Sequence, residues 1–140
     1  MAELTVMKQE ISAEKLQALG VALLYLFGSH AEGVAGPGSD IDVAVAMTDP
    51  RVVQGGTMEL YNNLFNTYSD TFDMSGFKNM DIVFLDRAPL ELCFDVITHG
   101  KALYEISPEF RLDFEDRIET RYRDFYPLLQ EFNKAILERM

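Results

Sequence analysis

The stretch YLFGSHAEGVAGPGSDIDVAVA, residues 25–46, joins two apolar runs through a polar break that contains four glycines and one proline. The first apolar run, 21–27, has the length and continuous apolar character of a strand that is covered on both faces. The second run, 40–47, is also predicted to be a strand. Because the two runs follow each other closely, they predict an early strand–loop–strand hairpin.

The second strand is unusual because two aspartates, Asp40 and Asp42, stand at its start. Side chains two residues apart on a strand point to the same face, about 7 Å apart. The alternation therefore sets these two carboxylates and Ala44 on one face and three apolar residues on the other: Ile41, Val43 and Val45.

The rest of the chain alternates between helical and strand patterns. Helices are predicted over 11–20, with Ser12 as the N-cap, 57–68 and 88–100, and strands over 79–86 and 101–106. From 108 to 140 the pattern is helical, broken or bent at Pro127. We expect one α/β domain, 1–140, with a small mixed sheet flanked by helices and a helical C-terminal extension, 108–140.

Composition narrows the possible functions. The net charge of −11 argues against nonspecific nucleic-acid binding, and favours either an anionic substrate screened by metal ions or a basic protein partner. Cys93 is the only cysteine, which excludes an internal disulfide and predicts a cytoplasmic protein. No apolar run is long enough for a transmembrane helix, and the first residues do not resemble an export signal.

The paired aspartates suggest a cation site. Two unpaired carboxylates at close range repel each other, whereas a divalent cation such as Mg²⁺ favours both ionised forms. Asp81, at the start of the strand 79–86, is the best third ligand, because a charge flanked by apolar neighbours would need a partner. Asp86 is the rival, but it is more easily interpreted as a solvated strand end or helix entry.

The break after the first strand could bind phosphate. Backbone N–H groups in the Gly28-Ser29 turn can face a phosphate, and the Ser29 hydroxyl can add a donor. Taken alone, Gly28-Ser29 could equally be an ordinary turn, and Asp40-x-Asp42 a solvated strand face. His30 is expected to be a loop residue rather than a ligand.

Gly28-Ser29, ten residues, then Asp40-x-Asp42 resembles the signature of the polymerase-β-like nucleotidyltransferases, whose small members are called minimal nucleotidyltransferases (MNT). The segment 80–105 resembles the part of that family that supplies the third aspartate, Asp81. The resemblance is greatest to the MntA-type antitoxins of HEPN–MNT toxin–antitoxin pairs. It implies that such a protein transfers AMP from ATP to a tyrosine of a partner HEPN ribonuclease and silences it.

The resemblance also implies a set of site residues. Asp40, Asp42 and Asp81 would be catalytic and would hold Mg²⁺, and nucleotide-binding residues would be Gly28, Ser29 and Ser39. In one respect the chain departs from many relatives, because His30 and Glu32 stand where those proteins carry arginines.

The sequence alone leaves three functions open. The protein could be an antitoxin that modifies another protein, a transferase that acts on a small molecule such as an aminoglycoside, or an inhibitor that acts by contact alone. A small-molecule enzyme usually carries a further substrate domain, for which 140 residues leave little room. The aromatic residues of 110–132 are predicted to pack in the core or to form a partner or dimer surface.

Overall fold

The computed structural model describes residues 6–36, 38–75 and 79–139. The remaining positions lie outside the description, and they include both ends of the predicted domain and the last residue of the predicted extension.

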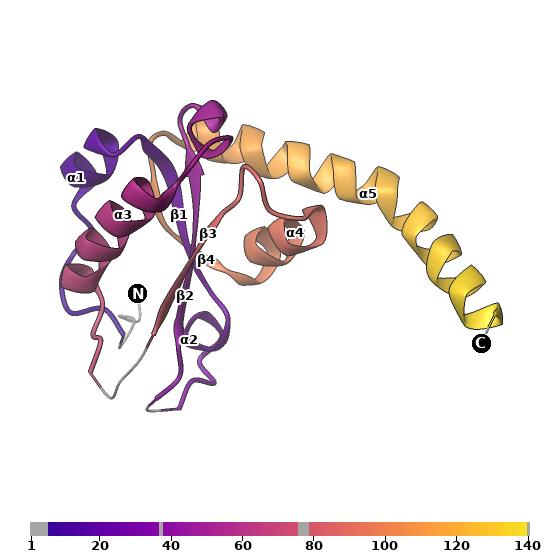
Figure 1. Cartoon of the computed structure of the whole chain (residues 1–140), viewed down its shortest axis with the longest axis horizontal. Helices are drawn as coiled ribbons and strands as arrows, with labels where there is room; N and C mark the ends of the chain where they lie inside the picture. The colour runs from indigo at the N-terminus through magenta and orange to yellow at the C-terminus, as the bar shows by residue number, and fades with distance from the viewer. Residues whose placement is uncertain (1–5, 37, 76–78, 140) are drawn as a thin grey trace.

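A four-stranded mixed sheet forms the centre of the molecule (Figure 1). Its strands are β1 (Val21–Phe27), β2 (Ile41–Met47), β3 (Met80–Phe84) and β4 (Lys101–Glu105), in the order β3-β2-β1-β4. β1 pairs antiparallel with both β2 and β4, whereas β2 and β3 are parallel. The predicted hairpin and the mixed α/β sheet are therefore confirmed.

The helices agree with the predicted pattern but differ at their ends. They are α1 (Ala13–Ala18), α2 (Ser29–Glu32), the 3-10 turn η1 (Pro50–Val53), α3 (Met58–Thr71), α4 (Leu90–His99) and α5 (Pro108–Glu138). Ser12 caps α1, because its side chain accepts a hydrogen bond from the backbone N–H of Lys15. β3 is shorter than the predicted 79–86, because the chain turns after Phe84.

Both faces of the sheet are covered, and each face has its own core (Figure 1). α1 and α3 cover one face, where Leu16 and Leu64 pack with the apolar side chains of β2: Ile41, Val43 and Val45. α4 and α5 cover the other face, where Cys93 and Phe114 pack with Ala44 and Ala46. This confirms the alternation predicted for β2, whose small residues Ala44 and Ala46 face the side covered by α4 and α5.

α5 begins against the sheet and then projects well beyond it, with its second half bent (Figure 1). The helix runs without interruption through Pro127, so the expected break there is wrong and the expected bend is seen. Within the described ranges, no helix combines the length and apolar character needed to cross a membrane.

Two buried tyrosines differ in whether the hydroxyl group is hydrogen-bonded, and this difference predicts opposite effects of mutation on stability. The Tyr25 hydroxyl donates a hydrogen bond to Glu115 Oε1 at 2.9 Å, whereas the buried Tyr68 hydroxyl has no hydrogen-bond partner among the described residues. An unpartnered buried hydroxyl costs about 1–3 kcal/mol. We expect Tyr68→Phe to raise the free energy of unfolding by about 1 kcal/mol, and Tyr25→Phe to lower it by about as much. Urea titration measures both, and a loss of stability in Tyr68→Phe would contradict the expectation.

Candidate active site at the start of two parallel strands

The candidate site lies at the sheet end where β1 stops and β2 and β3 start. Phe27, the last residue of β1, is opposite Asp42, and Asp42 is in register with Asp81 on the neighbouring parallel strand. Gly28 follows Phe27 directly. The strand pairing therefore brings together the glycine–serine turn and two aspartates that are far apart in the sequence.

The turn and the second aspartate constrain each other directly. Gly28 has φ of +75°, a conformation that side chains other than glycine rarely adopt. A Cβ atom at Gly28 would also lie 2.5 Å from Asp42 Oδ2, far inside contact distance. Glycine is therefore required here for two reasons, and the second of them is the position of the carboxylate.

The local field around Asp42 is negative. Partial burial raises the pKa of Asp42, and the nearby carboxylates of Asp81 and then Asp40 raise it further, while His30 acts in the opposite direction. Such a field is what a bound cation would relieve. Asp81 itself is exposed, although its neighbours Met80 and Ile82 are buried, so the expectation that an unpartnered charge there would be costly is wrong.

Of the three aspartates, Asp40 interacts least with the other two. It is exposed, lies just before β2, and its Oδ1 accepts a hydrogen bond from the backbone N–H of Asn79 at 3.3 Å. In the part of the chain that is described, no three His, Cys, Asp or Glu side chains are already placed to hold a metal ion. Strand register thus pairs Asp42 with Asp81, while one carboxylate oxygen of Asp40 is engaged by Asn79.

His30, which was expected to be a loop residue, stabilises the loop between β1 and β2. His30 belongs instead to the one-turn helix α2, and its Nε2 donates a hydrogen bond to the Ser39 carbonyl oxygen at 2.9 Å. The Ser39 hydroxyl accepts one from the backbone N–H of Gly36 at 2.8 Å. His30 therefore supports the approach to Asp40, a role that its place two residues after Gly28 could have suggested.

Asp86 lies at the opposite end of the sheet from this site. It is half-buried rather than solvated, because its Oδ2 accepts a hydrogen bond from the backbone N–H of Met47 at 2.8 Å. Burial raises its pKa. Asp42 and Met47 are five residues apart on one strand, about 16 Å. The rival third ligand is therefore too far from Asp42 to share its cation.

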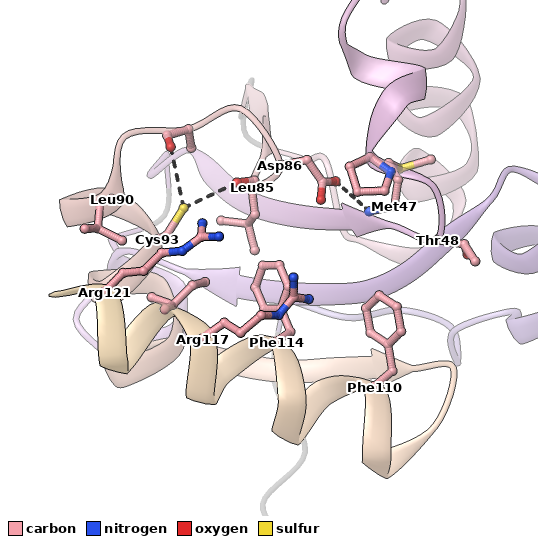
Figure 2. A pocket seen from close by; sticks show the side chains of 13 residues that line it. Met47, Thr48, Leu85, Asp86, Leu90, Cys93, Phe110, Phe114, Arg117 and Arg121 are labelled. Carbon is pink, nitrogen blue, oxygen red and sulfur yellow. Dashed lines mark hydrogen bonds between the residues drawn. The ribbon is translucent and has the colours of Figure 1, made fainter. Parts of the chain in front are cut away.

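A cavity of about 680 Å³ opens beside Asp86 (Figure 2). Arg117 and Arg121, one turn apart on α5, border it together with apolar side chains such as Phe114. Arg117 forms an exposed ion pair with Asp113 at 3.4 Å. This cavity is separate from the cluster of aspartates at the other end of β2.

The mixed sheet, with paired aspartates beside a glycine–serine turn, has the arrangement that the sequence resemblance implies for a nucleotidyltransferase. Residues 9–109 match the sequence model of the family described as "Polymerase beta, Nucleotidyltransferase". This match covers well over half of the chain, so the chain belongs to that family and is a nucleotidyltransferase by family.

Among curated proteins, the chain is similar to the protein adenylyltransferase MntA of Shewanella oneidensis, with 28% identity over 116 residues, 83% of this chain and 73% of that protein. Among solved structures, it is similar to a chain of a toxin–antitoxin complex with AMP-PNP, at 25% identity and a TM-score of 0.68, covering 89% of this chain and 94% of that one. It also shares its fold with a chain of a tri-AMPylated S. oneidensis HEPN toxin–MNT antitoxin complex (22% identity, TM-score 0.63, coverage 89% and 91%).

Proposed function

We propose that this chain is a cytoplasmic, Mg²⁺-dependent antitoxin that transfers AMP from ATP to a tyrosine hydroxyl of a partner HEPN ribonuclease toxin and thereby neutralises it. The observation that supports this most directly is the register that sets Asp42 beside Asp81, next to the Gly28-Ser29 turn. The similarity to a protein adenylyltransferase supports the type of transfer.

Asp40, Asp42 and Asp81 would hold the cation. Their carboxylate oxygens are the donors that Mg²⁺ prefers, and the raised pKa of Asp42 reflects a concentration of negative charge that a cation would neutralise. Bound there, Mg²⁺ would supply positive charge to the triphosphate and to the attacking oxygen.

Gly28, Ser29 and Ser39 would bind the nucleotide. Gly28 and Ser29 are placed directly beside Asp42 by the end of β1, which suits a turn that receives phosphate. Ser39 already has a structural role, because its hydroxyl accepts the Gly36 N–H, and it would contribute through its remaining donor. With His30 and the exposed Glu32 in place of arginines, nucleotide affinity would depend more strongly on the cation.

In the proposed reaction, the tyrosine oxygen attacks the α-phosphorus of ATP. A bond from this oxygen to phosphorus forms, the bond to the bridging oxygen breaks, and pyrophosphate leaves. Asp81 is the residue best placed to accept the tyrosine proton, because it is exposed at the sheet edge strand β3 while lying in register with Asp42. An exposed acceptor can be reached by a side chain of another protein.

Incubation with α-labelled ATP, Mg²⁺ and the product of the neighbouring gene tests this function. We expect label on the partner, mass spectrometry to locate AMP on a tyrosine, and partner ribonuclease activity to fall as label accumulates. Inhibition without any label would show a contact inhibitor instead, and label on an added aminoglycoside alone would show a small-molecule enzyme.

Mg²⁺ and ATP together are expected to raise the melting temperature of the protein, since ligands that bind only the native state stabilise it. Each alone should have a smaller effect, because the cation and the triphosphate neutralise each other's charge in this acidic site. Thermal unfolding at millimolar concentrations measures the shift. Equal melting temperatures in all four conditions would argue against a joint metal–nucleotide site.

The net charge of −11 predicts that the partner complex is sensitive to salt. A ribonuclease that binds a polyanion should carry a basic face, and an acidic antitoxin would be steered toward that face. Between about 0.05 and 0.5 M salt the screening length shrinks about threefold, so the association rate should fall steeply. Stopped-flow measurement checks this, and a constant rate would leave solubility as the explanation of the acidity.

A further inference from the structure

We propose that the projecting half of α5 pairs two copies of this chain through an apolar seam, defined here as Phe125, Leu129, Phe132 and Ile136. The inference depends on this helix alone, and it does not depend on the proposed transfer reaction. The family match ends at residue 109, so the seam lies in a part of the chain beyond the matched family region.

The spacing of the seam is that of a coiled coil. Counted from Tyr122, its residues follow at steps of three, four, three and four, which keeps them on one stripe of a helix. Tyr122 itself is covered by the body of the protein, because its ring stacks on Phe94 of α4 with centroids 3.8 Å apart. The seam continues this partly covered stripe beyond the point where the helix leaves α4.

Among the described residues, most of the seam is left uncovered. Phe125 is 43% exposed, Phe132 is 64% exposed and Ile136 is 44% exposed, while the helix that carries them extends away from the sheet (Figure 1). Isolated helices shorter than about 12–15 residues are marginal in water, and most helix stability comes from packing an apolar face. A second helix laid on the seam would supply that packing.

The charge of this segment favours a copy of the same chain as the second helix. Residues 119–139 contain four Lys or Arg and four Asp or Glu, so the whole charge of −11 belongs to residues 1–118. The positions that flank the seam in a heptad are all uncharged: Tyr126, Leu128, Asn133 and Ala135. Two copies would therefore meet on a neutral surface without like-charge repulsion, whereas a basic partner would gain no electrostatic attraction from it.

The test is the mass of the full chain in solution. Sedimentation equilibrium from about 1 to 100 µM should show a shift from the 15.9 kDa monomer toward twice that mass. A chain that stays monomeric across this range overturns the proposal. If the seam of such a monomer then became protected from hydrogen exchange only on adding the partner toxin, the seam would belong to the toxin complex instead.

Variants locate the contact. Phe132→Glu puts a charge on the seam and should produce a monomer, and so should Ile136→Glu. Gln130→Glu adds the same charge on the exposed outer face of the helix and should leave the dimer intact. Thermal unfolding verifies that each variant is folded. A dimeric Phe132→Glu, or a Gln130→Glu that dissociates, contradicts the seam.

The salt dependence of association distinguishes this apolar contact from an association driven by charge. Two bodies that each carry −11 repel, so raising salt from about 0.05 to 0.5 M should tighten the dimer. The proposed complex with a basic toxin should weaken over the same range, so the two associations can be distinguished even if one of them fails. A dimer that weakens with salt would overturn the neutral seam as its cause.

Discussion

Asp42→Asn is expected to abolish nucleotide transfer while leaving the protein folded. Mutating residues that only hydrogen-bond to metal ligands typically lowers metal affinity or activity about 10–100-fold. Loss of a metal ligand itself should lower transfer activity by more than this. The substitution keeps the shape of the side chain and removes the charge that lies in register with Asp81. Labelled-ATP transfer at saturating Mg²⁺ measures the effect.

The same variant should be more stable than the wild type when no metal is present. The pKa of Asp42 is raised in the folded state by burial and by Asp81 and Asp40, so ionising it costs stability. This loss of stability is absent at pH values below the pKa of Asp42 in the unfolded chain. It grows as the pH rises toward the pKa of Asp42 in the folded protein, and it is complete at neutral pH. The melting temperature of Asp42→Asn should therefore exceed that of the wild type at pH 7, and the gap should close in acid.

Asp86→Asn is the matched control. It removes a carboxylate of raised pKa at the opposite end of the sheet, and its amide oxygen can still accept the Met47 N–H. We expect this variant to retain transfer activity. Wild-type transfer by Asp42→Asn would exclude Asp42 from the site, and loss of transfer in both variants would mean that the effect is not local.

Gly28→Ala is expected to lose transfer nearly as completely, for a reason that lies in the backbone. An alanine there is strained at φ of +75°, and its Cβ would displace the Asp42 carboxylate from a distance of 2.5 Å. With ψ of −155°, Gly28 lies in a region that only glycine normally occupies, so the strain alone costs about 1–3 kcal/mol. Displacement of a reacting group by about 1 Å can cost about 100-fold in rate.

Gly33→Ala separates these two effects. Gly33 has almost the same φ, +74°, but a Cβ atom there would meet nothing within 4 Å. Gly33, at ψ of 17°, lies in the left-handed helical region, whereas Gly28, at ψ of −155°, lies in a region that only glycine normally occupies. In urea titration Gly33→Ala should therefore lose no more stability than Gly28→Ala, and only Gly28→Ala should lose transfer. Equal transfer by the two variants would show that the contact with Asp42 is unimportant, and equal loss would assign the effect to backbone strain in α2.

The local elements could be predicted because each depends on neighbours in the sequence. The alternation in β2 determined which side chains face each core, and Ser12 marked the start of α1. The glycine-rich break favoured the hairpin, because strand-length runs joined by a short connection usually pair antiparallel, as β1 and β2 do. The three aspartates could likewise be selected as candidates from the sequence alone.

The arrangement of those candidates was decided by the tertiary structure. Nothing local to Asp42 indicates that Asp81, on a strand reached only after α3, lies in register with it, while Asp86 lies at the far end. The sequence also did not show that Asp81 is exposed or that Asp40 is held by Asn79. Short-range patterns set periodicity and turns, but register between distant strands results from packing both sheet faces at once, because a slip of one residue would exchange the side chains that face the two cores.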